Sequence, residues 1–390
     1  MIAPLLLAAA LSAAASVLPI SQMDPHRPKE KGPWCEGWYT RIVDPTNNRS
    51  LAIVTASYLP KDAGHRDGES MPGYLAVAVQ EGIGTPLKVY ETFPDRTSLF
   101  QAGKPVRRDP DMDSPANFAW DASGNGKATQ DSLEIEIPGR IKVSARLGAR
   151  KPWDDKDLGP QGIGAYLKFL PLNWFVHSLG SECSYEITYP SEGGASATIT
   201  GQGYAHQEKN WGKLFPSAWI WLQSMSSDNT AHLALAGGRL DLRLMTPTAW
   251  MAGYRSEKVQ AYFRPSVIGT TFTTVISACR GRFEMTAENP AYKLEISAQA
   301  PLDSFGLLSI PGPQGFYPGA LESFSTEISA KLYDKRLRQE VESRTFLGGA
   351  LEFGGDYRRC EEPTFRTPPH ISENKLDSVK QQIEAFERMR

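Results

Sequence analysis

The feature that most constrains the fold is a succession of short apolar runs, interrupted by glycine, proline, asparagine and aspartate, from Cys35 almost to the end of the chain. The 390 residues include 34 glycines and 29 prolines, and long stretches with a helical period are almost absent. In many runs apolar residues alternate with polar or small ones, which is typical of a strand with one buried face. The sequence therefore predicts an all-β protein made of antiparallel sheets.

The alternation predicts strands in both halves of the chain. Those of the first half are expected at residues 51–58, 74–80, 133–137, 141–146 and 184–189. Those of the second half are expected at residues 197–203, 218–225, 230–236, 262–264, 271–279, 283–287, 292–298, 324–333, 341–346 and 350–357. Pro138 and Gly139 predict a tight hairpin between 133–137 and 141–147, because proline presets one turn angle and glycine permits the other.

The chain is long enough for about two domains of ordinary size. Since the strand pattern continues on both sides of Gly193 and Gly194, we expect two barrel-like domains, at residues 23–194 and 195–365. In the remaining tail, residues 366–390, four apolar residues recur at helical spacing and predict a short C-terminal helix. These are Leu376, Val379, Ile383 and Phe386.

The first 22 residues have the character of a secretory signal peptide. No charged side chain precedes Asp24, and an apolar core from Leu5 to Leu11 is followed by small residues at Ala13 to Ala15. We therefore expect secretion, or delivery to the lumen of the secretory pathway or of an organelle reached through it. A short N-terminal anchor is the alternative.

Charge and motif content exclude several classes of partner. The 42 basic and 44 acidic residues are interspersed and give a net charge of −2, so no basic stripe indicates nucleic acid. Neither a phosphate-binding Gly-x-x-x-x-Gly-Lys nor a Gly-x-Ser-x-Gly elbow occurs. The six histidines stand singly and no Cys-x-x-Cys pair is present, so we expect no metal site. The four cysteines are compatible with two disulfides or with buried free thiols.

Residues 201–224 concentrate the groups that carry chemistry. This stretch holds glycines, an acid, a histidine, lysines and three tryptophans. Two sets of side chains each share one face of an extended strand: Tyr204, His206 and Glu208 in one strand, and Trp219, Trp221 and Gln223 in the next. The sequence therefore predicts that polar and aromatic groups converge on one cavity.

The same stretch resembles the tocopherol cyclase family. The similarity lies in Gly203-Tyr204-Ala-His-Gln-Glu208-Lys209-Asn210-Trp211-Gly212 and Phe215-Pro216-Ser-Ala-Trp219-Ile-Trp221-Leu-Gln223. It extends upstream to Glu36-Gly37-Trp38-Tyr39 and downstream through Ala236-Gly-Gly238, Met285-Thr-Ala-Glu288 and Leu351-Glu-Phe-Gly-Gly355. The resemblance thus covers nearly all of residues 34–357.

Membership of this family would imply a pair of lipocalin-like β-barrels and a redox-neutral ring closure, in which a prenylated hydroquinone becomes a chromanol. The implied partner is a small hydrophobic molecule, with peripheral membrane contact as a route of uptake, and no redox cofactor is needed. The plastid members of the family carry transit peptides, whereas this leader resembles a secretory one. Related lipocalin-like pairs, such as carotenoid hydratases and fungal Diels-Alderases, use similar cavities for other lipids.

The ring closure requires an acid that protonates an alkene. Glu208 is the first candidate, because burial in an apolar barrel raises the pKa of a carboxyl and keeps it protonated. Its alternative is an ion pair with Lys209 or Lys213 at a barrel rim. Glu36 is the second candidate, with a role in a turn or an edge strand as its alternative.

Other residues are expected to receive the phenolic proton or to bind the substrate. His206 is the candidate base, although a hydrogen-bonded histidine is the simpler interpretation. Trp219 and Trp221 would stabilise a carbocation by their ring faces, or serve as core residues. Asn210 and Gln223 would orient the quinol hydroxyls or satisfy the backbone. Trp38, Tyr39, Tyr204 and Trp211 complete the predicted substrate-binding set.

Three functions remain open from the sequence. The first is a tocopherol cyclase-like intramolecular cyclase, and the second is a related isoprenoid hydratase or cyclase. The third is a non-catalytic carrier, because an apolar barrel can hold a lipid without any protonated acid.

Overall fold

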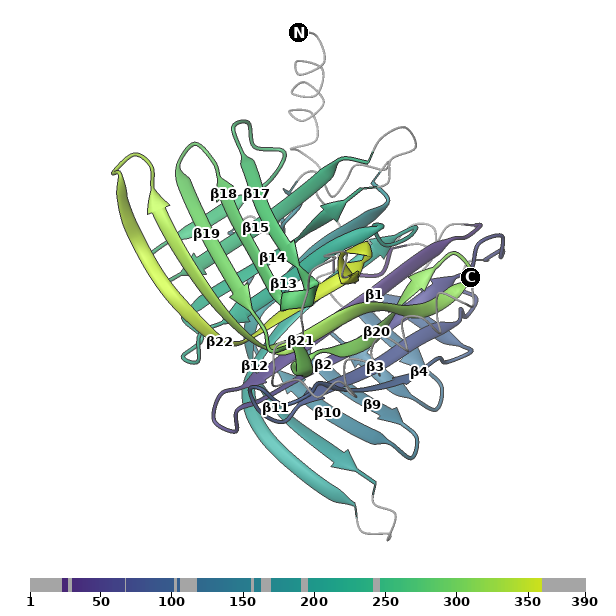
Figure 1. Cartoon of the computed structure of the whole chain (residues 1–390). Coiled ribbons are helices and arrows are strands. Elements are labelled where there is room, and N and C mark those ends of the chain that lie inside the picture. The colour runs from purple at the N-terminus through teal and green to yellow at the C-terminus, as the bar shows by residue number, and fades with distance from the viewer. Residues whose placement is uncertain are drawn as a thin grey trace.

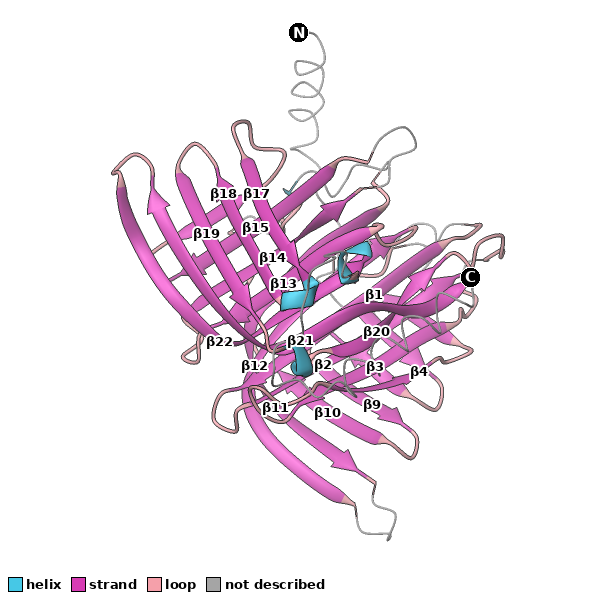
Figure 2. Cartoon of the chain, in the orientation of Figure 1, coloured by secondary structure: helices cyan, strands magenta, loops and turns pink. Residues whose placement is uncertain are grey.

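The computed structural model describes residues 23–26, 30–66, 68–101, 104–105, 118–155, 158–162, 170–190, 196–240 and 246–359. The predicted signal peptide and the predicted tail helix lie outside these residues. Strands dominate the described chain (Figure 2). Its helices are three 3-10 turns, η3 (Ala278–Arg280), η4 (Leu302–Ser304) and η5 (Asp356–Arg358). None of these is long and apolar enough to cross a membrane. The all-β prediction is confirmed.

The first sheet has 12 strands, in the order β4-β3-β2-β1-β12-β11-β10-β9-β8-β7-β5-β6. Its first and last strands in the chain, β1 and β12, are antiparallel neighbours at the middle of the sheet. The strands are β1 (Trp34–Asp44), β2 (Arg49–Leu59), β3 (Gly73–Gln80), β4 (Lys88–Thr92), β5 (Thr97–Gln101), β6 (Lys104–Pro105), β7 (Phe118–Ala122), β8 (Gly126–Thr129), β9 (Ser132–Ile137), β10 (Ile141–Leu147), β11 (Leu172–Tyr189) and β12 (Ala197–Gly212).

The second sheet has 10 strands, in the order β16-β15-β14-β13-β22-β21-β19-β18-β17, with β20 also paired to β21. It repeats the plan of the first, because its first and last strands, β13 and β22, are again neighbours. The strands are β13 (Ala218–Met225), β14 (Ala231–Arg239), β15 (Thr248–Ser256), β16 (Gln260–Phe263), β17 (Thr271–Ser277), β18 (Arg282–Glu288), β19 (Tyr292–Gln299), β20 (Gly306–Gly312), β21 (Gly315–Asp334) and β22 (Gln339–Gly355).

The two curled antiparallel sheets form a double lipocalin-like fold (Figure 1). The chain passes from the first sheet to the second between Gly212 and Ala218. The proposed domain boundary at residues 194 and 195 stays a prediction.

Local structure follows the sequence pattern closely, with informative exceptions. The hairpin of β9 and β10 is confirmed: Ile137 pairs with Ile141, and Gly139 has a φ of 71° in the turn. The two strands expected at 341–346 and 350–357 form one strand, β22. Gly348 has a φ of 67° and lies where the pairing of β22 with β21 shifts register, so it marks a bulge rather than a turn. Strands β1, β4, β5, β6, β7, β8, β15 and β20 were not among those predicted.

Four hydrophobic clusters hold the molecule together. One fills the curl of the first sheet and includes Trp38 and Trp211, and a second fills the curl of the second sheet and includes Leu222 and Phe353. The third cluster joins the sheets and includes Trp221. A small fourth cluster also joins the sheets, because Tyr74 of β3 stacks on Phe316 of β21. Burial at about 25 cal/mol per Å² makes all four stabilising, and the third and fourth bring the two sheets together.

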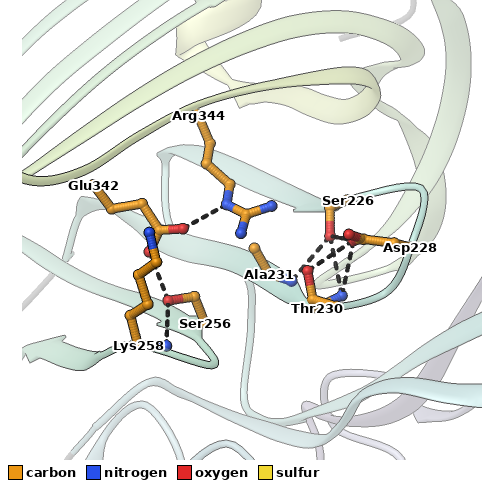
Figure 3. Close-up of polar contacts among 8 residues, drawn as sticks. All are labelled: Ser226, Asp228, Thr230, Ala231, Ser256, Lys258, Glu342 and Arg344. Carbon is orange, nitrogen blue, oxygen red and sulfur yellow. Dashed lines mark hydrogen bonds and ion pairs between the residues drawn. The ribbon is translucent and has the colours of Figure 1, made fainter.

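Turns of the second sheet are tied by a polar network (Figure 3). Oε2 of Glu342 accepts a hydrogen bond from Ser256 Oγ at 2.6 Å, and its Oε1 accepts one from Arg344 Nε at 2.6 Å. Asp228 Oδ1 accepts a hydrogen bond from Ser226 Oγ at 2.5 Å within the turn between β13 and β14. These bonds fasten the turn ends of the strands.

The cysteines do not form two disulfides. Cys35 and Cys183 are buried free thiols, whereas Cys279 is disulfide-bonded. The expectation of two bridges is therefore wrong, as is that of four free thiols. The two free thiols lie in the first sheet, where burial raises the pKa of each to about 12 and leaves it unreactive.

Candidate active site

Side chains of strand β1 point alternately into two compartments, the interior of the first sheet and the interface between the two sheets. Trp38 belongs to the cluster inside the first sheet, whereas Tyr39 packs against the cluster between the sheets. Since side chains alternate along a strand, Glu36 shares the face of Trp38, and Arg41 shares the face of Tyr39. The candidates Glu36 and Tyr39 are therefore in different compartments, although they are only three residues apart.

Glu36 forms a buried ion pair inside the first sheet. Its Oε1 lies 2.7 Å from Lys209 Nζ, and it accepts a hydrogen bond from the backbone N–H of His26 at 2.8 Å. Burial alone would raise the pKa of Glu36, but Lys209 and His26 hold this pKa below its ordinary value. A buried, ion-paired carboxylate with a lowered pKa is a poor proton donor, so the geometry favours a structural role for Glu36, and its catalytic role stays a prediction.

Two predicted substrate-binding residues, Trp38 and Trp211, also lie in the interior of the first sheet. Trp38 donates from Nε1 to the backbone oxygen of Met23 at 2.9 Å, and the ring of Trp211 stacks on His26 at 4.2 Å between centroids. Lys209 Nζ lies 5.2 Å from the Trp38 ring and 4.9 Å from the Trp211 ring. Because residues of the chain itself occupy these aromatic faces, Trp38 and Trp211 do not join the candidate site.

The other face of β1 meets β12 at the interface between the sheets. Tyr39 is the cross-strand partner of Glu208, and Arg41 is the partner of His206. Tyr204 and Asn210 follow on the same face of β12 by the alternation of side chains, and both keep some accessible surface. The predicted common face of Tyr204, His206 and Glu208 therefore points toward the second sheet.

The second sheet contributes acids and indoles to this interface. Along the sheet, Trp221 of β13 pairs with Glu352 of β22, which pairs in turn with Glu322 of β21. Trp219 and Gln223 flank Trp221 on the same face of β13. Side chains of the two predicted strands thus meet, with two carboxyls in addition, and the cavity on which they were expected to converge stays a prediction.

Hydrogen bonds connect the two sheets through Glu208. Its Oε2 accepts a hydrogen bond from Trp221 Nε1 at 2.9 Å and lies 3.0 Å from Nε2 of the buried His206. Lys209 faces the opposite compartment, and Lys213 is exposed. Among the ion pairs of the described residues, neither lysine is paired with Glu208, so the rim ion pair considered for Glu208 is not present.

Two acids of the second sheet have raised pKa values. Burial and the neighbouring Glu352 raise the pKa of Glu322 to about 8. Burial, offset in part by a hydrogen bond from Trp219 Nε1 and reinforced by Glu208, raises the pKa of Glu352 to about 7. Because like charges and low dielectric both disfavour ionisation, these carboxyls can act as proton donors near neutral pH.

Glu322 is better placed than Glu352 to act as a proton donor. It is fully buried, and its Oε1 accepts a hydrogen bond from the Tyr39 hydroxyl at 2.8 Å. Its Oε2 is buried and has no hydrogen-bond partner among the residues that the structure describes. The second oxygen is therefore free to carry the proton.

Aromatic and apolar groups surround these acids. The rings of Tyr39 and Trp221 meet edge to face, with centroids 5.0 Å apart. The cluster between the sheets also contains Val54, Val89 and Met251, which are only partly buried. Hydrophobic surface thus remains accessible at the cluster between the sheets, as a hydrophobic ligand requires. Two surface depressions, along β9–β12 and at the turn between β7 and β8, lie away from this interface.

Sequence reasoning missed Glu322, Glu352 and Arg41. Glu352 lay within the downstream similarity Leu351-Glu-Phe-Gly-Gly355, which was a usable signal. Glu322 and Arg41 carry no local signature, because their neighbours in space come from the other sheet. In the described part of the chain, no group of three or more histidine, cysteine or acidic side chains could hold a metal ion.

Comparison with known proteins agrees with this geometry. The family model described as tocopherol cyclase-like matches residues 180–355, a range that includes Glu208, Trp221, Glu322 and Glu352. No curated protein matches the sequence at a significant level.

Two solved structures of CghA show the same fold at low sequence identity. CghA with Sch210972 aligns with a TM-score of 0.55 and 9% identity, covering 86% of this chain and 97% of CghA. A second structure of CghA gives the same score over 87% of this chain and 96% of CghA. A putative AttH from Nitrosomonas europaea aligns with a TM-score of 0.46 and 14% identity, over 87% of this chain and 99% of its own. Over residues 180–355 the sequence matches the tocopherol cyclase-like model, which confirms there the resemblance drawn from the sequence.

Proposed function

We propose that this protein is an acid-catalysed cyclase that closes an oxygen-containing ring on a prenylated hydroquinone or a similar isoprenoid phenol. The observation that carries the proposal is the pair of buried carboxyls with raised pKa values, Glu322 and Glu352, at an apolar interface lined by the indoles of Trp219 and Trp221. The match of residues 180–355 to the tocopherol cyclase-like model supports ring closure as the reaction, and the apolar surroundings support a small hydrophobic substrate.

Glu322 is the proposed proton donor. Its Oε2–H transfers the proton to the less substituted carbon of a trisubstituted alkene, where a C–H bond forms and a tertiary carbocation results. The Tyr39 hydroxyl bonded to Oε1 then stabilises the carboxylate that remains. Glu208, the first candidate from the sequence, is assigned to the base instead, because Trp221 and His206 both lie within hydrogen-bond distance of its Oε2.

The aromatic rings are proposed to stabilise the cation. Trp221 and Tyr39 lie beside the donor, and a cation over an aromatic face gains about 0.5 to 2 kcal/mol. Their edge-to-face packing leaves part of the Tyr39 surface accessible. These rings therefore direct the cation to the side of the carboxyl that generated it.

Glu208 and His206 are proposed as the base. As the phenolic oxygen attacks the cation, a C–O bond forms and the O–H proton passes to this hydrogen-bonded pair, whose atoms are 3.0 Å apart. One proton is taken up and one is released, so the reaction is redox-neutral and the enzyme returns to its starting state after proton exchange with solvent.

The proposed test incubates the purified protein with a prenylated hydroquinone such as dimethylphytylquinol and follows chromanol by chromatography and mass spectrometry. Product formation that is lost in Glu322→Gln, with ligand binding retained, would support the cyclase. Binding without product in the wild type would favour the carrier, and a hydroxylated open-chain product would favour the hydratase.

Entry into the secretory pathway remains part of the proposal. The apolar leader of residues 1–22 supports it. Sequencing the N-terminus of the protein recovered from the culture medium tests it, and recovery only inside cells with the leader intact would contradict it.

A further inference from the structure

Arg41 is a buried cation without an ionised partner. Its side chain is fully buried, yet no carboxylate lies within ion-pair distance of it in the described part of the chain. Two other well-buried cations are paired: Lys209 with Glu36 at 2.7 Å, and Arg264 with Asp154. A buried charge ordinarily requires such a partner, because desolvation is expensive.

The groups that contact Arg41 are all neutral. Nη1 donates to Oε1 of Gln223 at 2.6 Å, Nη2 donates to the backbone oxygen of Gly348, and the guanidinium carbon lies 4.8 Å from the centroid of the Phe324 ring. Nε of Arg41 and Nε2 of Gln223 are buried donors with no partner among the described residues. Two unsatisfied donors thus lie together at the interface between the sheets.

The nearby titratable groups do not supply a fixed negative charge. Tyr39 and Glu322 are the charged or titratable groups that act on Arg41 most strongly, and His206 is its cross-strand neighbour. Burial raises the pKa of Tyr39 well above its usual value and that of Glu322 to about 8, so both are neutral at pH 7. The positive charge of Arg41 is therefore left for another group to neutralise.

We propose that Arg41, together with Gln223, binds an oxyanion at the polar end of the substrate, so that the ligand is an acidic amphiphile rather than a neutral one. A guanidinium offers a planar set of N–H donors that suits a carboxylate or another delocalised oxyanion. The inference rests on the proposed function only for where the substrate lies.

The geometry relates this anchor to the proton donor. Arg41 and Tyr39 are two residues apart on one face of β1, a separation of about 7 Å along the strand. A head group held at Arg41 places atoms a few bonds along the ligand next to Tyr39 and its partner Glu322. Arg41 is thus a specificity-determining residue that sets which carbon meets the acid.

The test compares equilibrium binding of dodecanoate and dodecanol, two ligands with the same chain and different head groups, to the full-length protein at pH 7. Calorimetry or tryptophan fluorescence reports binding without any turnover. We expect the wild type to bind dodecanoate roughly tenfold to hundredfold more tightly, as charge-assisted hydrogen bonds provide. Arg41→Met should abolish this preference while retaining dodecanol, and the exposed Arg282→Met should retain it.

The outcomes separate this inference from the cyclase proposal. Equal affinities in the wild type, no binding of either ligand, or an unchanged preference in Arg41→Met would each overturn the oxyanion site. Selective binding without chromanol formation would instead refute the cyclase and leave the oxyanion site standing. If Arg41→Met fails to fold, Arg41→Lys supplies the comparison, because lysine keeps the charge but loses the planar donor set, and a reduced preference is expected.

Discussion

The hydroxyl of Tyr39 donates a hydrogen bond of 2.8 Å to Glu322, a residue 283 positions later in the chain and in the other sheet. Tyr39 comes from β1 and Glu322 from β21, so the bond joins the two halves of the fold at the candidate site. The site therefore belongs to neither sheet alone, and its chemistry depends on their packing.

Replacement of the proposed acid should separate catalysis from folding. Glu322→Gln keeps the shape and the oxygen that accepts from Tyr39 but removes the acidic proton. Since general acid catalysis contributes roughly 10²- to 10⁴-fold, kcat should fall by about that factor while the melting temperature is retained. Steady-state kinetics and thermal unfolding measure the two effects, and unchanged kcat would remove Glu322 from the mechanism.

The rate should fall as the pH rises. The proposed donor works only when protonated, and the pKa of Glu322 is raised to about 8, so kcat should be level below this value and decline above it. Glu352→Gln removes the neighbouring charge that raises the pKa of Glu322, so the decline should begin at lower pH. A pH–rate profile of both proteins is the measurement, and a decline that stays in place would contradict this coupling.

The ring of Trp221 should matter more than its N–H group. Trp221→Leu removes the aromatic face and should lower kcat by roughly 2- to 30-fold, which corresponds to about 0.5 to 2 kcal/mol. Trp221→Phe keeps a ring and loses only the donor to Glu208, so it is the matched control and should retain more activity. Equal losses in both variants would assign the effect to the hydrogen bond instead.

Lys209 should contribute to stability and not to turnover. Lys209→Met leaves Glu36 buried without its partner, which should lower the free energy of unfolding by about 3 to 5 kcal/mol. Adding Glu36→Gln should restore part of the loss, because no carboxylate then remains unpaired. Urea unfolding of the single and double variants tests this, and kcat of the folded fraction should equal that of the wild type.

Gly354 should be intolerant of any side chain. A Cβ atom at this position would overlap the indole of Trp219, the ring that donates to Glu352. Gly354→Ala should therefore displace Trp219, lower the melting temperature and reduce turnover. The neighbouring exposed position Leu347 provides a control, since Leu347→Ala removes surface bulk only. Equal stability of the two variants would show that the ring can move without loss.

Local patterns predicted much of the fold and part of the site. Alternation located β13, and turn residues located the hairpin at Gly139, because both signals are contained in a few neighbouring residues. The common face of His206 and Glu208 followed from the period of a strand. Which face met the second sheet could not be read from the sequence, and this is why Glu36 and Trp211 were expected at the site.

The residues that sequence reasoning missed depend on distant contacts. Glu322 becomes a neutral acid only because β21 buries it beside Glu352 and opposite Tyr39. In the sequence Arg41 cannot be distinguished from an exposed charged residue of a strand, because its burial depends on the second sheet. Long-range pairing creates both properties, and no short stretch of sequence encodes them.

Neighbouring side chains of β1 point to opposite faces of the first sheet, so this strand is sensitive to a shift of register. Deleting Gly37, which lies between Glu36 and Trp38, would turn Tyr39 and Arg41 into the interior of the first sheet and turn Trp38 toward the interface. Deleting two residues would restore the original alternation beyond the gap. Variants with an even number of residues inserted or deleted here should therefore retain the fold and the site better than variants with an odd number.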